Sequence, residues 1–142
     1  IISRPKNENI VMISETEYNE MMKAKRNADY LAMIDKSMAE AEAGGFVDVK
    51  TIDELEHTNN FTPTAWQQYT DWQLEDKKIV KRINELIKSI DRDGLSQGLG
   101  KPEPLKYRKA WSRRITEEHR LVYNFDNNQN LIIYSCKEHY ED

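Results

Sequence analysis

Residues 110–137, AWSRRITEEHRLVYNFDNNQNLIIYSCK, decide the fold of this chain. They contain three short runs rich in β-branched and aromatic residues, at Ala110–Ile115, His119–Phe125 and Asn130–Lys137. The polar segments TEE and DNNQ separate these runs, and connections this short join neighbouring antiparallel strands. The stretch therefore predicts a three-stranded antiparallel meander.

Two helices are expected before the meander. Thr62-Pro63 has the form of an N-cap followed by Pro at the first helical position. Asp76 starts a second helix, whose apolar residues recur at helical spacing up to Ile90. Gly94–Pro104 is predicted to be a loop. Two helices packed on an antiparallel sheet make a compact α+β unit.

The N-terminal part predicts a β-hairpin followed by one long helix. Two β-rich runs, the second at Ile10–Ile13, are separated by a polar connection. The capping box Ser14-Glu15-Thr16-Glu17 then starts a helix that runs from Glu15 to Ala43 and ends at a Gly-Gly pair. Lys25 and Asp35 interrupt its apolar stripe. Because the hairpin is too short to cover that stripe, the helix needs a partner surface.

The chain divides into two segments joined by a short junction. The sequence FVDVKTIDELEH, residues 46–57, mixes apolar residues with acids and predicts an extended tail that becomes ordered on another surface. We place the first segment at residues 1–57, the junction at 58–60 and the second unit at 61–142.

The net charge of −4 hides a difference between these parts. Residues 1–57 carry 7 Lys and Arg against 12 Asp and Glu, whereas residues 58–142 carry 14 against 13. Between Lys101 and Arg120 there are seven basic residues and three acidic ones, and a basic cluster of this kind suits a polyanion. The acidic first segment could cover that cluster as easily as leave it open.

Composition and spacing exclude several classes of protein. No apolar run reaches the roughly 20 residues that span a bilayer, and the first residues lack the apolar core of a signal peptide, so we expect a cytoplasmic protein. The single cysteine, Cys136, excludes an intramolecular disulfide and is expected to be buried. The spacing of His57, His119 and His139 does not suit a metal site, and we expect neither a metal nor a cofactor.

The basic cluster adjoins residues of the types that cleave RNA without a metal. Such cleavage needs a base for the 2'-hydroxyl proton, cations for the phosphate and an acid for the leaving oxygen. Glu103, Arg120 and His139 are of these three types. Taken alone, a glutamate such as Glu103 is more often an exposed loop acid than a base, and a histidine such as His139 is more often solvated than catalytic. Arg113 and Arg114 are consecutive on a strand, so only one of them can point into a given cleft.

Several segments of the chain resemble a known toxin family. They are DKKIVKRINELIKSI (76–90), KPEPLK (101–106), WSRRITEEHRLVY (111–123) and the pair His139-Tyr140. They are similar to the YoeB toxins of the RelE superfamily, which are ribosome-dependent mRNA interferases. The resemblance covers about Phe61 to Tyr140 and implies a RelE/YoeB microbial RNase-like fold. Residues 1–47 are similar to the Phd/YefM antitoxins, which are normally separate proteins.

The resemblance implies roles for individual residues. Glu103 matches the family's general base, Arg120 its transition-state cation, and His139 and Tyr140 its acid and positioning groups. The implied reaction is transesterification of mRNA in the ribosomal A site, which leaves a 2',3'-cyclic phosphate and a 5'-hydroxyl. The expected RNA- and phosphate-binding residues, all basic, are Lys106, Arg108, Lys109 and Arg114.

The resemblance also implies how the first segment acts. The long helix is expected to lie on the toxin unit, and the acidic tail to reach its basic face and neutralise it, in cis or between copies. The expected contact residues of the tail are Phe46, Val47, Asp48, Ile52, Asp53, Glu54 and Leu55. Operator DNA is not favoured as a partner, because the segment lacks the first strand and helices of the antitoxin's DNA-binding unit. The alternative function is a non-enzymatic DNA-binding autorepressor module, in which the basic strands grip a phosphate backbone.

Two features depart from the toxin pattern. The connection YRKA, residues 107–110, is short and alters the basic loop. Glu141-Asp142 follow Tyr140, at which the toxins of this family typically end. These two carboxylates are expected to repel RNA phosphate beside the proposed acid.

Overall fold

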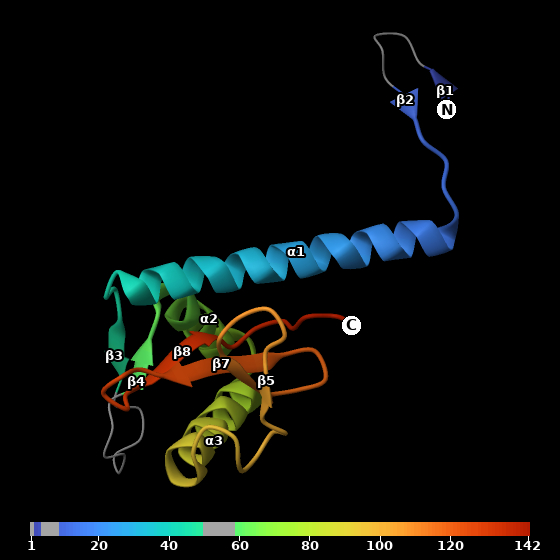
Figure 1. The fold of residues 1–142 in the computed structure, drawn as a ribbon. Coiled ribbons are helices and arrows are strands. Elements are labelled where there is room, and N and C mark those ends of the chain that lie inside the picture. The colour runs from blue at the N-terminus through green and yellow to red at the C-terminus, as the bar shows by residue number, and fades with distance from the viewer. Residues whose placement is uncertain (1, 4–8, 50–58) are drawn as a thin grey trace.

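The computed structural model describes residues 2–3, 9–49 and 59–142, which form helices on both faces of a mixed sheet (Figure 1). The helices are α1 (Glu15–Glu42), α2 (Pro63–Glu75) and α3 (Lys77–Asp93). The strands are β1 (Ile2–Ser3), β2 (Asn9–Ile10), β3 (Val47–Val49), β4 (Asn59–Phe61), β5 (Glu103–Pro104), β6 (Trp111–Arg114), β7 (Arg120–Phe125) and β8 (Leu131–Ser135). Within these residues no helix is long and apolar enough to cross a membrane.

A six-stranded sheet in the order β3-β4-β8-β7-β6-β5 forms the centre of the described structure. Strands β6, β7 and β8 are antiparallel neighbours, which confirms the predicted meander. β4 pairs in parallel with β8, and β3 pairs antiparallel with β4. Asn59 and Asn60, which we expected in the junction 58–60, are therefore buried residues of the sheet.

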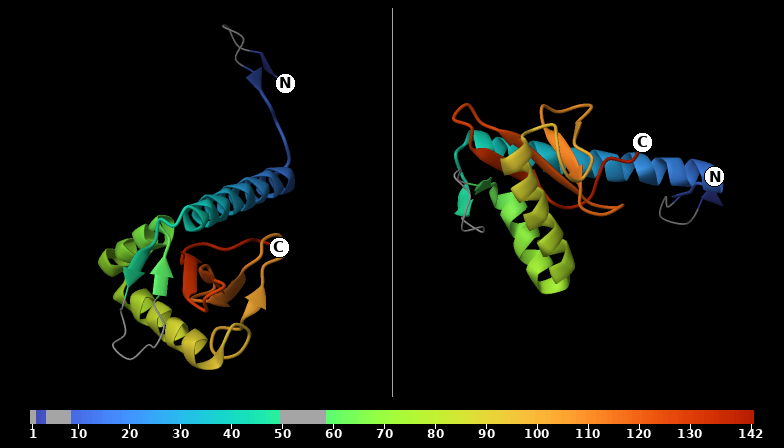
Figure 2. Two further views of the ribbon diagram at one scale, coloured as in Figure 1. Left: turned by 60° about the vertical axis from the view of Figure 1, so that its left-hand side comes forward. Right: turned by 90° about the horizontal axis from the view of Figure 1, so that it is seen from below.

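The helices cover the two faces of the sheet (Figures 1 and 2). α2 and α3 pack on one face, where Leu121 and Tyr123 of β7 join the larger apolar core. α1 lies across the other face, where Val122 packs with Ile34 of the helix. Because successive side chains of a strand point to opposite faces, consecutive residues of β7 serve both cores. Cys136 is buried in the larger core, as expected, and burial raises the pKa of its thiol.

Each helix begins at the capping residue that the sequence predicts. The side chains of Ser14 and Thr62 each accept a hydrogen bond from the backbone N–H three residues later, at 3.0 and 3.1 Å. Asp76 accepts one from the N–H two residues later, at 3.0 Å. These bonds satisfy N–H groups that have no partner inside the helix. α1 ends at Glu42, one residue before the predicted Ala43, and Gly44 follows the C-cap residue with a φ of 75° that suits a residue without a Cβ.

Polar bonds join the second half of α1 to the rest of the chain. The Ser37 hydroxyl donates to the carbonyl of Tyr134 at 2.6 Å, so it accepts from the Thr62 hydroxyl, 2.5 Å away. The Glu40 carboxylate accepts from the backbone N–H of Thr64 at 2.9 Å. These contacts tie α1 to β8 and to the start of α2. The partner surface that the helix needs is thus provided within the same chain.

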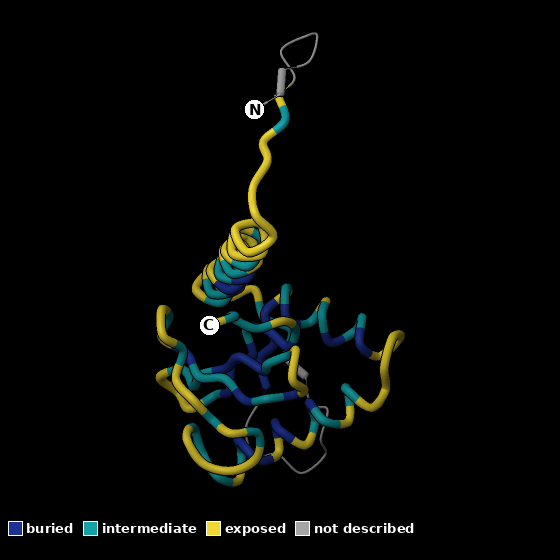
Figure 3. Tube along the Cα trace, turned by 90° about the vertical axis from the view of Figure 1, so that its right-hand side faces the viewer, coloured by how far each residue is buried: buried dark blue, intermediate teal, exposed yellow. Residues whose placement is uncertain are grey.

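The first half of α1 extends beyond the sheet (Figures 1 and 3). Its apolar residues Tyr18 and Met21 are exposed. β1 and β2 pair antiparallel, as the predicted hairpin requires, and the connection at residues 4–8 lies outside the described residues. β2 ends at Ile10, so residues 11–13, which we expected in a strand, lie outside it and are exposed.

The expected tail, residues 46–57, is described only as far as Val49. Its described part forms β3, and Val47 packs against the larger core. β3 and β5 are opposite edges of the sheet. Four of the expected contact residues lie outside the described part of the chain: Ile52, Asp53, Glu54 and Leu55.

The substitution Ile34→Ala is expected to lower the free energy of unfolding by about 2–4 kcal/mol, because truncating a buried side chain leaves a cavity. Ile34 is fully buried between α1 and the sheet. Met21→Ala, at an exposed position of the same helix, is the matched control and should change stability by less than about 0.5 kcal/mol. Urea unfolding followed by circular dichroism measures both. Equal effects would contradict the packing of α1 on the sheet.

Candidate active site

A cavity of about 200 Å³ lies where β5, β6, the start of β7 and the C-terminal residues meet the middle of α1. Seven of the eight residues expected to act in catalysis or RNA binding line it: Glu103, Lys106, Arg108, Arg114, Arg120, His139 and Tyr140. The eighth, Lys109, is exposed and lies outside this lining. Residues from separate elements of the chain are therefore gathered at one place.

The pairing of β6 with its two neighbours sets the layout of the cavity. Arg114 pairs with Arg120 in the β6–β7 register, and Glu103 pairs with Ser112 in the β5–β6 register. Ser112 and Arg114 are two residues apart, so they share a face of the strand. Arg113 points to the opposite face and is fully buried. As predicted, only one of the two consecutive arginines faces the cavity.

Arg114 and Arg120 concentrate positive charge in the cavity. Burial lowers the pKa of Arg120, and the neighbouring charge of Arg114 lowers it further. Nη1 of Arg120 donates to the carbonyls of residues 116, 117 and 119 at 2.7, 3.0 and 3.2 Å, which fixes the orientation of the guanidinium. Nε of Arg114 is buried and has no hydrogen-bond partner among the described residues. A phosphate oxygen is a suitable acceptor for such a group.

The two histidines near the cavity differ in their bonding. Nδ1 of His139 lies 2.7 Å from the carbonyl oxygen of Glu118. Because a carbonyl only accepts, Nδ1 carries a proton, and Nε2 is the nitrogen that can gain or release one. Nδ1 of His119 instead accepts from the backbone N–H of Glu138 at 2.8 Å, and its ring packs edge-on against Trp72. Burial lowers the pKa of His119. Its contacts with the Glu138 backbone and Trp72 fit the structural role that we expected from the sequence.

Tyr140 lies against Tyr107, with ring centroids 5.4 Å apart. A hydrogen bond between the two side chains raises the pKa of Tyr140. Glu103 is an exposed residue of the short strand β5. In the described part of the chain, no group of three or more His, Cys, Asp or Glu side chains is arranged to hold a metal ion.

α1 forms one wall of the cavity. Tyr30 and Leu31 line it, and burial raises the pKa of the Tyr30 hydroxyl. Asp35 makes a two-bond ion pair with Arg108, with Oδ2 2.8 Å from Nη2, and this pairing lowers the pKa of Asp35. We expected the acidic tail to cover this face, but the covering residues that the structure describes belong to the helix. Pairing of β3 with β4 keeps the described tail, Phe46, Val47 and Asp48, at the far edge of the sheet.

Glu141 and Asp142 add carboxylates around the cavity. The Glu141 carboxylate binds the Arg26 guanidinium at 2.6 and 3.1 Å. The backbone of Glu141 also exchanges two hydrogen bonds with the Asn27 side chain, at 2.7 and 2.8 Å. Asp142 lies 2.6 Å from the ammonium of Lys106. One carboxylate thus ties the C-terminal residues to α1, and the other pairs with a cation that we expected to bind phosphate.

Sequence reasoning missed the residues that α1 brings to the cavity. The position of Asp35 could have predicted a contact, because a charged residue on an apolar helical stripe implies an oppositely charged group on the facing surface. That group, Arg108, lies too far along the chain for the sequence to pair the two. Tyr107 and Ser112 also line the cavity, and no spacing in the sequence distinguishes them.

The part of the chain that builds this site matches a family model. Residues 61–140 match the model of the YoeB-like toxin of the bacterial type II toxin-antitoxin system. The chain belongs to this family. The toxin YoeB of Synechocystis is 52% identical over 83 residues, which cover 57% of this chain and 94% of that protein. The toxin YoeB of Escherichia coli K12 is 54% identical over 78 residues, which cover 54% and 90%.

Solved structures of YoeB proteins agree with this assignment. A chain of a YoeB-YefM complex from Staphylococcus aureus is 50% identical with a TM-score of 0.55, and the match covers 60% of this chain and 99% of that one. A YoeB dimer from the same organism gives 52% identity and a TM-score of 0.55, covering 58% and 95%. The YoeB relatives are thus matched over nearly their whole length, while residues 1–60 lie outside the family match.

The ion pair between Asp35 and Arg108 predicts a pH-dependent stability. Pairing holds the pKa of Asp35 below its ordinary value of 3.8, so the stabilisation is present above that value and is lost as the pH falls through the lowered pKa. Asp35→Asn should therefore reduce the urea midpoint at about pH 7, and the difference from the unsubstituted chain should vanish at about pH 2. Asp29→Asn is the control, because Asp29 pairs with Lys25 on its own helix. A difference that persists in acid would contradict the assignment.

Proposed function

We propose that the chain is a ribosome-dependent mRNA endoribonuclease held inactive by its own N-terminal segment. One observation carries the proposal: a single cavity gathers a carboxylate, two adjacent arginines and a histidine with a free Nε2. These groups supply the base, the cations and the acid of metal-independent RNA cleavage. Membership of the YoeB toxin family supports the same reaction.

The proposed mechanism assigns each proton to a side chain. Glu103 removes the proton of the 2'-hydroxyl, and the 2'-oxygen attacks the neighbouring phosphorus. The bond from phosphorus to the 5'-oxygen breaks, and Nε2 of His139 gives that oxygen its proton. The products are a 2',3'-cyclic phosphate and a 5'-hydroxyl. Each proton transfer of this kind contributes about 10²–10⁴-fold to the rate.

The cations and the tyrosine complete the proposed site. Arg114 and Arg120 hold the non-bridging phosphate oxygens, whose negative charge grows in the transition state. The unpaired Nε of Arg114 supports this role. Lys106 and Arg108 bind adjoining phosphates of the strand, and Tyr140 positions the reacting one.

The N-terminal segment, residues 1–57, is proposed to act as an antitoxin in cis on the toxin domain, residues 61–142. Tyr30 and Leu31 of α1 form one wall of the cavity, whose volume is about 200 Å³. One of the proposed phosphate-binding cations, Arg108, is already paired with Asp35 of α1. Tethering keeps α1 at an effective concentration in the millimolar range, so modest contacts suffice.

Detaching α1 is expected to activate the full chain. Ile34→Asp places a carboxylate in the apolar contact between α1 and the sheet and should raise cleavage of mRNA on translating ribosomes by at least about tenfold, because an unpaired buried charge costs several kcal/mol. Met21→Asp, on the exposed part of α1, is the matched control and should leave activity low. The residues of the larger core lie outside this contact, so the toxin domain should stay folded. Equal mRNA cleavage by the Ile34→Asp and Met21→Asp chains would contradict the proposed inhibition in cis.

Removing the proposed base or acid should abolish that activity. In the Ile34→Asp chain, Glu103→Gln or His139→Gln is expected to lower the single-turnover rate by about 10²–10⁴-fold. Glu85→Gln, an exposed carboxylate of α3, is the control and should retain the rate. Full activity of both site variants, with salt-sensitive DNA binding intact, would favour the repressor function instead.

A further inference from the structure

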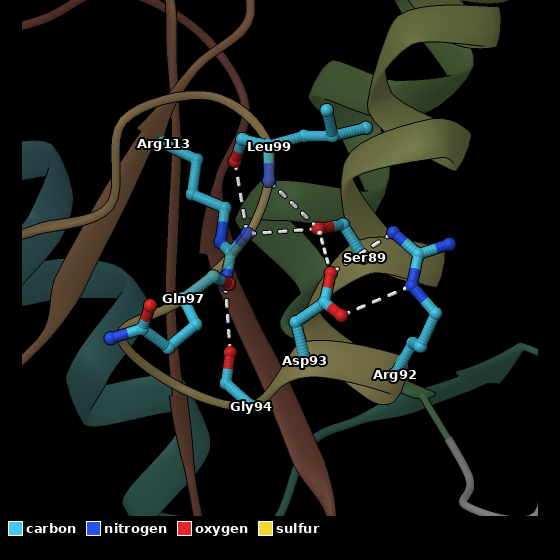
Figure 4. Close-up of polar contacts among 7 residues, drawn as sticks. All are labelled: Ser89, Arg92, Asp93, Gly94, Gln97, Leu99 and Arg113. Carbon is cyan, nitrogen blue, oxygen red and sulfur yellow. Dashed lines mark hydrogen bonds and ion pairs between the residues drawn. The ribbon is translucent and has the colours of Figure 1, made fainter.

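Arg113 of β6 is a buried charge on the face of the sheet away from the cavity. Figure 4 shows its guanidinium among polar groups of α3 and of the loop that follows. Its Nε donates to the Tyr123 hydroxyl at 2.9 Å, and Nη1 donates to the Ser89 hydroxyl at 3.2 Å. The carbonyls of residues 94, 97 and 99 accept from its Nη groups at 2.7, 2.6 and 2.9 Å. A guanidinium has five N–H donors, and all five are used.

Burying a charged guanidinium in a protein core is unfavourable in free energy. Moving a charged group out of water costs several kcal/mol, and an apolar residue of similar size is often as stabilising. Asp93 provides a nearby countercharge: its carboxylate accepts from the Ser89 hydroxyl at 3.0 Å, and the charge of Arg113 contributes to its lowered pKa. The advantage of Arg113 over an apolar residue is therefore geometric, because its planar fork fixes the directions of its acceptors.

Most of those acceptors belong to one loop, residues 94–100, which the guanidinium holds in a single conformation. The backbone N–H of Leu99 donates to the Ser89 hydroxyl at 2.9 Å. Gly98 has a φ of 106°, and a Cβ at this position would lie 2.3 Å from the Ser89 hydroxyl and 2.6 Å from an Asp93 oxygen. The loop thus leaves no room for a side chain where it passes the cluster.

The same loop leads directly into β5. The carbonyl of Gly100 accepts from the backbone N–H of Arg114 at 2.6 Å, and Glu103 pairs with Ser112. Only two residues separate the last anchored residue, Gly100, from Glu103. β6 therefore holds the backbone that leads to Glu103 from two sides, by its own backbone and by the side chain of Arg113.

We propose that Arg113 is a positioning residue for Glu103: the guanidinium and the loop it binds set the place of this carboxylate relative to Arg114 and Arg120. This inference rests on the proposed function, in which Glu103 is the base. One strand then performs two tasks with consecutive residues, since Arg114 lines the cavity and Arg113 holds the loop behind it.

Amide hydrogen exchange on the full chain, measured by NMR, tests the proposal without any cleavage assay. Arg113→Lys keeps the charge but loses the planar guanidinium, and should speed exchange at the amides of Leu99 and Arg114 by about tenfold or more. The same is expected for Leu105, whose N–H follows β5 and donates to the carbonyl of Ala110 at 2.9 Å. Amides of β8 should stay within about twofold of the unsubstituted chain. Arg92→Lys is the control, because Arg92 binds Asp93 from the solvent side. It should leave all these amides unchanged.

Two results would overturn the proposal. One is faster exchange in β8 to the same degree, which would make Arg113 a stabilising residue only. The other is unchanged exchange at Leu105 and Arg114. If Arg113→Lys does not fold, Ser89→Ala decides the matter, because it removes one of the five acceptors and the partner of the Leu99 N–H. It should give the same local pattern with smaller amplitude, and a uniform or absent effect counts against the proposal.

A kinetic measurement then separates positioning from binding. In the Ile34→Asp chain, Arg113→Lys should lower kcat for ribosome-dependent cleavage at least about tenfold and change KM by less than about twofold, since a misplaced base weakens the transition state more than substrate binding. Loss confined to KM would contradict the role. If the Ile34→Asp chain with Arg113 intact does not cleave mRNA, the proposed function fails, while the exchange result still decides whether Arg113 positions the loop.

Discussion

The alternation of side chains along β6 and β7 is the constraint on which the other features of this protein depend. It sends Leu121 and Tyr123 into the core beneath α2 and α3, and Val122 toward α1. It also separates two consecutive arginines, so that one is buried in a complete set of hydrogen bonds and the other faces the cavity. A shift of one residue in the pairing would exchange all of these positions.

The second organising feature is the balance of charge around the cavity. Lys106 and Arg108, in the loop before β6, pair with carboxylates from the C-terminal residues and from α1 respectively. Ion pairs at such exposed positions contribute little each, typically below about 1 kcal/mol. The apolar contact between α1 and the sheet therefore contributes most of the free energy that keeps the helix in place. The ion pairs determine which cations are neutralised.

Local signals predicted the elements well, and contacts between distant segments were harder. The caps at Ser14, Thr62 and Asp76 and the meander were readable because each depends on residues within a few positions of one another. The parallel pairing of β4 with β8 could not be predicted from the sequence, since it joins residues about seventy positions apart and produces no periodic pattern of residues. For the cavity, the resemblance to the toxin family identified Glu103, Arg120 and His139. The position of α1 beside the cavity could not be predicted, because the apolar stripe of the helix does not give its orientation on the sheet.

The order of the two segments along the chain has a consequence for its synthesis. A ribosome makes α1 before any strand of the meander, and it adds His139, Tyr140 and Asp142 last among the residues that line the cavity. The helix is therefore available when the meander emerges, and the sheet can form against it. In the proposed inhibition in cis, a site assembled in this order meets its covering helix as soon as the last residues of the cavity emerge from the ribosome.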